Sequence, residues 1–377
     1  DIKIRHRDRL LVQAKTALVK HVQPAYEELI TYFENLQNEA SPTDGVWDLP
    51  DGENFYNTRL ANITTTDLTA EEIHNIGLQE VDRIHAEMRN IMQQVGFEGT
   101  LQEFFVYVNN DDSHFYPETE QGKADYVAEA TRIVDEMRAK LDQLFITQPK
   151  ADIIVKPVEA FREESAGKAF YQSPALDGSR PGTYYVNTFD MKVVPKYQME
   201  ALAYHEGIPG HHMQIAISQE LENIPMFRKF GWYTAYGEGW ALYSEYIPKE
   251  MGFYTDPYSD FGRLAMELWR ACRLVVDTGI HAKKWTREQG IDYYMNNTPN
   301  VEADVVKMVE RHIVMAAQAT GYKIGMLKIL ELREKAKSTL GNAFDIREYH
   351  EVVLTNGRLP LNILEKQVDK WIASKLN

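Results

Sequence analysis

The sequence predicts a mainly α-helical protein with one small β-sheet. Apolar residues recur at three- to four-residue spacing along most of the chain, which is the periodicity of a helix with one buried face. Runs rich in β-branched and aromatic residues are few, and they gather between residues 153 and 187. With 377 residues, 44% of them hydrophobic, the chain is long enough to bury a large core.

The helices follow from apolar spacing and capping signals. A long first helix is predicted by the apolar positions from Leu10 to Phe33, and a later one by those from Val127 to Leu144. Between them, Thr69-Ala-Glu-Glu72 forms a capping box, which opens a helix that runs through Ile91. Further helices are expected near residues 199–221, 233–250, 260–282, 287–296, 301–334 and 360–374.

Three short segments predict the strands of the sheet. These are Ile153–Val155, Lys168–Tyr171 and Thr183–Asn187, and the turn-rich segment Asp177–Gly182 separates the last two. The proline- and glycine-containing segment Ala40–Tyr56 is expected to be a loop. The change from helices to strands near residue 149 divides the chain into an N-terminal helical region, 1–148, and a second region, 149–377, which we expect to be continuous with it.

Composition excludes several functional classes. The 41 basic and 56 acidic residues give a net charge of −15, which repels a phosphate backbone, so nucleic acid is not an expected partner. No apolar run approaches the roughly 20 residues that a membrane span requires. The single cysteine, Cys272, excludes an internal disulfide and fits a core position. Oligomeric state stays open.

The start of the chain bears on its processing. It begins at Asp1 without an initiator methionine, which indicates a processed protein or a fragment whose export signal would not be visible. An exported and a cytoplasmic location are therefore both open, as is the question whether residues before Asp1 complete the fold.

The densest chemical signal is the segment His205–His212, which reads His-Glu-Gly-Ile-Pro-Gly-His-His. It holds three imidazoles and a carboxylate within eight positions, although the whole chain has only 11 histidines. On an undistorted helix His205 and His212 would share a face, but they would lie about 10 Å apart along the axis. His211 would face another side, so a regular helix cannot bring either pair to one metal ion.

Pro209 makes a regular helix improbable in this segment. It lacks a backbone donor and clashes with the preceding turn, while Gly207 and Gly210 permit unusual backbone angles. We therefore expect a two-residue bulge, which would bring His211 to the fifth position of the helical zinc motif His-Glu-x-x-His. The alternative is a helix-terminal turn whose imidazoles cap backbone carbonyls.

A third metal ligand is expected from the segment Tyr236–Glu245. Glu238 and Glu245 are seven residues apart on one helical face, among small and aromatic residues. A carboxylate in an apolar setting is costly unless it is paired or bound to a metal. Two histidines and one glutamate, with a position left open for water, are the usual ligands of a catalytic zinc ion.

At these residues the sequence resembles a bacterial family known as domain of unknown function 885. Its members carry the segments that match His205–His212 and Glu238–Tyr243, and are typically longer at the N-terminus, so this chain is expected to be their C-terminal two-thirds. The resemblance implies a kinship with zinc peptidases of the gluzincin type, which are mostly helical with a small sheet beside the metal. It also covers Thr64–Thr69, Asp177–Thr188, Val276–His281, Gly321–Gly325 and Leu359–Leu361.

The kinship implies a role for each matching residue. His205 would be a ligand of one Zn²⁺ ion, Glu206 the general base and Glu238 the third ligand, with Glu245 supporting a ligand from behind. For the second histidine we prefer His211, because Gly210-His211 aligns with a Gly-His pair of the gluzincins. His212 is the alternative.

A late tyrosine and one strand are weaker candidates for contact with the substrate. Helical gluzincins commonly use a late tyrosine to stabilise the oxyanion, and Tyr322 is the position we choose, against a packing role. The strand Thr183–Asn187, with Tyr185 and Asn187, is expected to pair with an extended peptide, unless it is an ordinary core strand.

Three basic residues follow the glutamate pair on the next helix. Arg270, Arg273 and His281 could bind a substrate carboxylate, although structural ion pairs explain such arginines as well.

The predicted function is that of a zinc-dependent hydrolase, a metallopeptidase that cleaves short peptides. Glu206 would take a proton from water and pass it to the leaving amine. Two alternatives stay open: a hydrolase of a non-peptide amide or ester, and a metal- or peptide-binding protein without catalysis. The substrate and the choice between exo- and endopeptidase are not determined at this level. The catalytic residues all fall within region 149–377.

Overall fold

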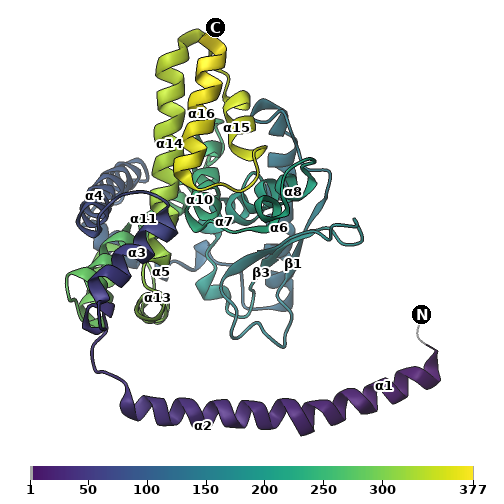
Figure 1. Cartoon of the computed structure of the whole chain (residues 1–377). Helices are drawn as coiled ribbons and strands as arrows, with labels where there is room; N and C mark the ends of the chain where they lie inside the picture. Colours follow the sequence, from purple (N-terminus) through teal and green to yellow (C-terminus); the bar gives the residue numbers. More distant parts are fainter. Residues whose placement is uncertain (1–2, 377) are drawn as a thin grey trace. The chain divides into compact units, whose positions relative to one another are not determined.

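The computed structural model describes residues 3–376, apart from the side chain of Arg5, and it divides the chain between Thr43 and Asp44. The first unit consists of α1 (Ile4–Ala17), a π-helical turn (Leu18–Val22) and α2 (Gln23–Glu39), which continue one another (Figure 1). The predicted first helix is therefore present. None of the described side chains in α1 and α2 is buried, and apolar ones such as Leu11 and Phe33 are exposed.

The second unit, Asp44–Asn377, begins with four α-helices, each of which contributes buried residues. The predicted capping box starts α4, because the Glu72 amide donates to Thr69 Oγ1 (3.2 Å) and the Thr69 amide donates to Glu72 Oε2 (2.8 Å). The expected loop ends earlier than predicted, since α3 begins at Gly52. The four helices are α3 (Gly52–Thr64), α4 (Ala70–Gln94), α5 (Leu101–Asn110) and α6 (Glu120–Arg138).

The three predicted strands form one sheet in the order β1-β3-β2, with β1 (Ile153–Pro157), β2 (Ala169–Gln172) and β3 (Gly182–Val186). β3 pairs in parallel with β1 and antiparallel with β2, and all five of its residues are buried. The expectation that strand Thr183–Asn187 offers an edge to a peptide is therefore wrong, because β3 is the central strand and both its edges are occupied. β2 lies at an edge and packs against α7.

The rest of the second unit is helical. α10 and α14 approach closely, since a Cβ on Gly239 would lie 2.5 Å from the Gly325 backbone. The predicted helix 301–334 is broken, because Ala317 adopts a left-handed conformation (φ 70°) between α13 and α14. The helices are α7 (Met199–Glu206), α8 (His211–Glu220), α9 (Met226–Phe230), α10 (Thr234–Glu250), α11 (Pro257–Ala282), α12 (Arg287–Asn297), α13 (Glu302–Val314), α14 (Gly321–Leu340), α15 (Ile346–Leu354) and α16 (Leu361–Leu376).

The mainly α-helical fold with a small sheet is thus confirmed. Among the described helices, none combines the length and the apolar character that crossing a membrane would require.

Candidate metal centre

The histidine-rich segment interrupts a helix instead of continuing it. α7 ends at Glu206, the next four residues form a turn that contains a cis Ile208–Pro209 peptide bond, and α8 begins at His211. Trp240, fully buried on α10, holds the turn by donating from Nε1 to the Pro209 carbonyl (2.9 Å). Gly210 is required for this path, because a Cβ there would lie 2.0 Å from the His205 carbonyl oxygen. The break is larger than the expected two-residue bulge.

The turn brings the two ends of the segment together. The His205 and His211 rings lie 4.9 Å apart between centroids, at 86° to each other. Glu238, one turn into α10, places Oε2 at 3.7 Å from His205 Nε2 and at 3.5 Å from His211 Nε2. One donor atom from each of these three residues lies within 4.8 Å of the other two.

This arrangement suits a metal ion better than direct hydrogen bonds. Distances of 3.5 to 3.7 Å are too long for a hydrogen bond. Ligands about 2.0–2.1 Å from a tetrahedral Zn²⁺ ion lie roughly 3.3 Å apart, close to the separations found here. Two imidazoles and one carboxylate are also the donor set of catalytic zinc sites. The three residues therefore fit the ion in number, chemical type and spacing.

Glu245 fixes the orientation of His205 from behind. Its Oε1 lies 2.7 Å from His205 Nδ1, and both side chains are almost completely buried. A carboxylate that accepts from one ring nitrogen leaves the other nitrogen free for a metal and increases its basicity. Burial alone lowers the pKa of His205, but the carboxylates of Glu238 and Glu245 raise it to about 9. Burial raises the pKa of Glu238, yet the two imidazoles hold it well below its usual range.

His212 faces away from this group. Its Nδ1 lies 2.9 Å from the Tyr171 hydroxyl, and its Nε2 lies 3.0 Å from the Ala151 carbonyl. Burial lowers its pKa to about 4, so the ring is neutral at pH 7. A neutral ring can donate from Nε2 to Ala151 while Nδ1 accepts from Tyr171. Both nitrogens of His212 are thus used by the packing of α8 against the strand region.

The three metal-ligand candidates open into a cavity of about 410 Å³. Glu206, next to His205 at the end of α7, also lines it, as does Tyr322 near the start of α14. Burial and the charge of Glu238 raise the pKa of the Tyr322 hydroxyl. The cavity thus brings together candidate residues from four helices, α7, α8, α10 and α14.

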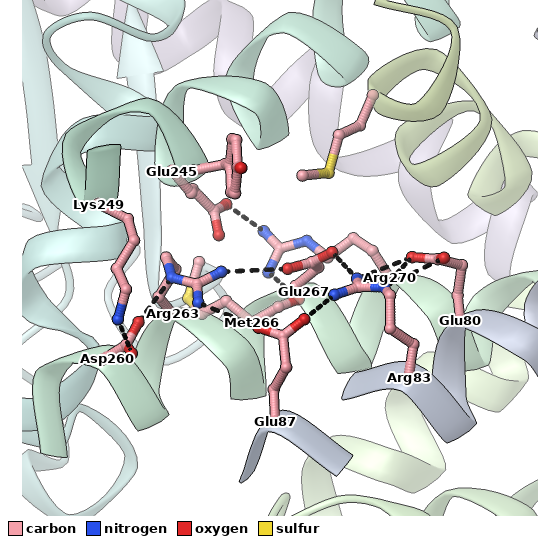
Figure 2. A network of polar contacts seen from close by, with 12 residues as sticks. Glu80, Arg83, Glu87, Glu245, Lys249, Asp260, Arg263, Met266, Glu267 and Arg270 are labelled. Atoms are coloured by element: carbon pink, nitrogen blue, oxygen red, sulfur yellow. Dashed lines mark hydrogen bonds and ion pairs between the residues drawn. The ribbon is translucent and has the colours of Figure 1, made fainter. Parts of the chain in front are cut away.

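Arg270 and Arg273, both on α11, line the same cavity. Arg270 Nη2 lies 3.7 Å from Glu245 Oε1, and Figure 2 shows its guanidinium pointing toward that carboxylate. The Arg273 guanidinium lies 4.4 Å from the centre of the Tyr322 ring. Both arginines are buried.

Three predicted substrate-binding residues lie elsewhere, since none of them lines this cavity. His281 uses both nitrogens, near the Val46 amide (3.2 Å) and the His312 carbonyl (2.9 Å). Asn187 donates to three backbone carbonyls of the segment 163–167 and so closes that loop. Tyr185 stacks on Phe170, with ring centroids 4.8 Å apart. These three side chains contact other parts of the protein and do not line the cavity.

Sequence reasoning missed Tyr171 and Trp232, which line the cavity. Tyr171 comes from β2, and Trp232 lies 6.1 Å from the His211 ring between centroids. The sequence contained one signal that points to β2. Gly182–Val186, which forms β3, lacks polar alternation, and this is typical of a strand buried on both faces. A strand beside it, such as β2, was therefore the better candidate to line the site.

The sequence matches a family model, and the fold is similar to solved structures. The family model described as a bacterial protein of unknown function, DUF885, matches residues 2–368. A crystal structure described as a "putative lipoprotein" from Colwellia psychrerythraea is 40% identical, with a TM-score of 0.97, over 99% of this chain and 64% of that one. This chain therefore spans less than two thirds of that relative. No curated protein matches the sequence.

Two further solved structures are more distant. A "putative lipoprotein of unknown function" from Shewanella oneidensis is 21% identical, with a TM-score of 0.75, over 97% of this chain and 67% of that one. A "putative oligoendopeptidase F" from Bacillus anthracis str. Ames is 14% identical, with a TM-score of 0.35, over 85% of this chain and 59% of that one. The first supports the fold, and the second is too dissimilar to support any argument.

Proposed function

This chain belongs to the bacterial DUF885 family, and we propose that it is a zinc-dependent hydrolase that cleaves peptide bonds. One observation carries the proposal: His205, His211 and Glu238 converge within 4.8 Å, and Glu206 lines the cavity into which they open. A structural zinc site closes its coordination with four protein ligands, whereas a catalytic site has three and keeps one position open. Three ligands beside a cavity favour catalysis.

The three ligands would hold the ion, and the remaining residues would carry the proton chemistry. A bound zinc ion supplies Lewis acidity, which polarises the scissile carbonyl and makes water more acidic. Glu206 is adjacent to a ligand and lines the cavity, so its carboxylate would accept a proton from the attacking water. The same carboxylate would then donate that proton to the leaving amine.

Two other side chains would support the reaction. Glu245 holds the His205 ring with Nε2 toward the cavity, which preserves the ligand geometry without contact with the substrate. Tyr322 would donate a hydrogen bond to the oxygen that becomes negatively charged. Because the pKa of its hydroxyl is raised, Tyr322 remains a donor throughout the neutral range.

The edge strand offers a surface for the substrate backbone. Ala169, Phe170 and Tyr171 of β2 line the cavity, and β2 lies at the edge of the sheet. An extended peptide can add to such an edge through main-chain hydrogen bonds. This favours a peptide over a compact amide or ester as substrate.

Glu206→Gln tests the mechanism. It removes the proton acceptor and retains the shape of the side chain, so we expect hydrolysis to fall by roughly 10²–10⁴-fold with an unchanged zinc content. Zinc is measured by elemental analysis, and hydrolysis by mass spectrometry on a library of short peptides. Glu200→Gln is a matched control on the same helix, because Glu200 does not line the cavity.

Three outcomes would contradict the proposal. Equal activity of Glu206→Gln and the wild type would eliminate the general base. A protein that neither contains nor binds a divalent metal would eliminate the metal centre. Turnover of simple esters or non-peptide amides, with no peptide cleaved, would show that the protein is a hydrolase of non-peptide substrates.

A further inference from the structure

We propose that Arg273 and Arg270 bind the free C-terminal carboxylate of the substrate, so that the protein acts as an exopeptidase from that end. This inference rests on the proposed function for the cleavage step. It does not depend on that function for the recognition of the carboxylate, which can be measured as binding alone.

Arg273 is a buried cation for which the described part of the chain provides no counterion. It is 8% exposed, and its Nε is buried without a hydrogen-bond partner. Among the residues that the structure describes, no carboxylate pairs with it and no acceptor receives a hydrogen bond from it. Its guanidinium lies over the Tyr322 ring, 4.4 Å from the ring centroid. Because an unpaired buried charge is unfavourable, this guanidinium is suited to an anion that arrives with the ligand.

Arg270 supplies a second donor group beside the metal-ligand candidates. Its Nη1 donates to the Met266 carbonyl (3.1 Å), its Nη2 lies 3.7 Å from Glu245, and its Nε is buried without a partner. Glu245 in turn contacts His205 at 2.7 Å. Only one carboxylate therefore separates the Arg270 guanidinium from a metal ligand. An anion held by the two arginines would lie a short distance from the scissile carbonyl.

A second cavity, of about 320 Å³, extends the site beyond the two arginines. It shares Ala169, Glu206, Arg270 and Arg273 with the first cavity, so the two cavities adjoin each other. Its lining also includes Lys307 and Arg311, which are exposed.

The charge of this second cavity is opposite to that of the whole protein. Five cationic residues line it against two carboxylates, and one of the five, Lys168, is already paired with Asp304 (3.0 Å). The chain as a whole has a net charge of −15. Such a local excess of positive charge favours an anionic group on the ligand and repels an amino terminus.

A carboxylate matches these donors better than other parts of a peptide. The planar guanidinium binds a carboxylate through two parallel hydrogen bonds, and two adjacent guanidinium groups can hold both of its oxygens. In an unmodified peptide, that group is either the C-terminus or an acidic side chain. Arg270 is close to the candidate metal ligand His205, since Glu245 contacts both residues. This proximity favours the C-terminus, because in every peptide the terminal carboxylate lies at a fixed distance from the last peptide bonds.

The test measures binding and cleavage separately. N-acetylated tetrapeptide libraries, ending in a free carboxylate or in a carboxamide, are incubated with Glu206→Gln protein, both zinc-loaded and chelator-treated. Retained peptides are identified by mass spectrometry. We expect the free acids to be retained about 10- to 100-fold more strongly than the amides, the range for hydrogen bonds to a charged group. With wild-type protein, we expect cleavage to be confined to the last one or two bonds of the free acids.

Arg273→Lys, made in the Glu206→Gln protein, distinguishes a role of Arg273 in binding the substrate carboxylate from a role in maintaining the fold. It retains the positive charge but loses the planar donor pair, so the preference for free acids should fall about 10-fold while the retention of amides is unchanged. Arg333→Lys in the same protein is the matched control, because Arg333 is another buried arginine, paired with Glu250, that lines neither cavity. A merely structural role of Arg273 would reduce retention of both libraries equally.

The outcomes distinguish this inference from the proposed function. Equal retention of acids and amides, or retention of neither, overturns the inference, even if the wild type cleaves peptides. Retention of amides only when they contain Asp or Glu assigns the arginines to a side chain and also overturns it. Preferential retention of free acids without any cleavage upholds the carboxylate site and contradicts the hydrolase.

Discussion

At the scale of single residues, the adjacent side chains of His211 and His212 have different environments. His211 directs Nε2 toward Glu238, and its Nδ1 is buried without a partner. His212 uses both ring nitrogens in hydrogen-bond contacts with Tyr171 and Ala151. Adjacent residues on a helix project about 100° apart, so the first turn of α8 can present only one of them to the candidate metal centre.

Paired substitutions at these two positions test this difference. His211→Gln should weaken zinc binding by at least ~100-fold, because even substitutions behind a ligand reduce affinity 10- to 100-fold. His212→Gln should retain zinc but destabilise the fold by ~1–3 kcal/mol, since it disturbs two buried polar contacts. A zinc titration and a thermal unfolding curve for each variant measure the two effects. If His212→Gln lost zinc and His211→Gln kept it, our choice of ligand would be reversed.

At the scale of elements, the candidate metal centre depends on how the turn between α7 and α8 is held. Trp240 of α10 donates to the Pro209 carbonyl in that turn. It lies two residues after Glu238, so the same helix supplies a candidate ligand and supports the turn that presents another. The geometry of the site is therefore coupled to the packing of α10.

Trp240→Phe tests this coupling. It removes the donor and leaves the Pro209 carbonyl unpaired, so we expect weaker zinc binding and a loss of ~1–3 kcal/mol of stability. Tyr236→Phe is the matched control on the same helix, because it removes a buried hydrogen bond to the distant Val353 carbonyl (2.9 Å). The control should lose stability but not zinc affinity. Equal zinc affinities of the two variants in a competition titration with a chelator would show that the turn does not need this support.

At the scale of the whole molecule, a buried ionic network joins helices that are distant in the sequence. Glu267 of α11 contacts Arg263 of its own helix, Arg83 of α4 and Lys323 of α14, as Figure 2 shows for the two arginines. Lys323 is fully buried and also pairs with Glu80 (2.8 Å). Breaking one partner of such a network leaves an uncompensated buried charge.

This network predicts how stability depends on pH. Burial alone raises the pKa of Glu267, but Lys323, Arg83 and Arg263 lower it from 4.5 to about 2. A carboxyl whose pKa is lowered in the folded state stabilises the fold above the unfolded value, and this contribution is lost as the pH falls from 4.5 toward 2. The shift corresponds to ~3 kcal/mol. Metal-free protein, unfolded with urea between pH 7 and pH 3, should therefore lose stability steeply below pH 4.5.

Glu267→Gln identifies the group responsible for the acid sensitivity. It should destabilise the metal-free protein by roughly 3–5 kcal/mol at pH 7 and flatten the decline below pH 4.5. Glu331→Gln, which removes an exposed partner of Lys328, should change stability by less than ~1 kcal/mol. Parallel pH profiles of Glu267→Gln and the wild type would assign the acid sensitivity to other carboxyls.

Much of the fold could be predicted because its signals are local. The capping box at Thr69 and the apolar spacing of α4 act over a few residues, and both are found where the sequence indicates them. α3, α5, α9 and α15 were missed. The break between α13 and α14 was missed as well, because it depends on the left-handed backbone of Ala317, which no glycine marks.

The sequence by itself determined the fold class and the residues from which a metal centre can be built, because helix periodicity and ligand chemistry are properties of residue type and spacing. Only the tertiary structure decided which of them meet. It directs His211 toward Glu238 and His212 toward the strands, and it makes β3 the central strand. It also places Arg273 beside the cavity with no ion-pair partner among the described residues. It also leaves the apolar positions of α1 and α2 exposed, although their spacing predicts a buried face. Burial and pairing depend on contacts between segments far apart in the chain, which local patterns do not specify.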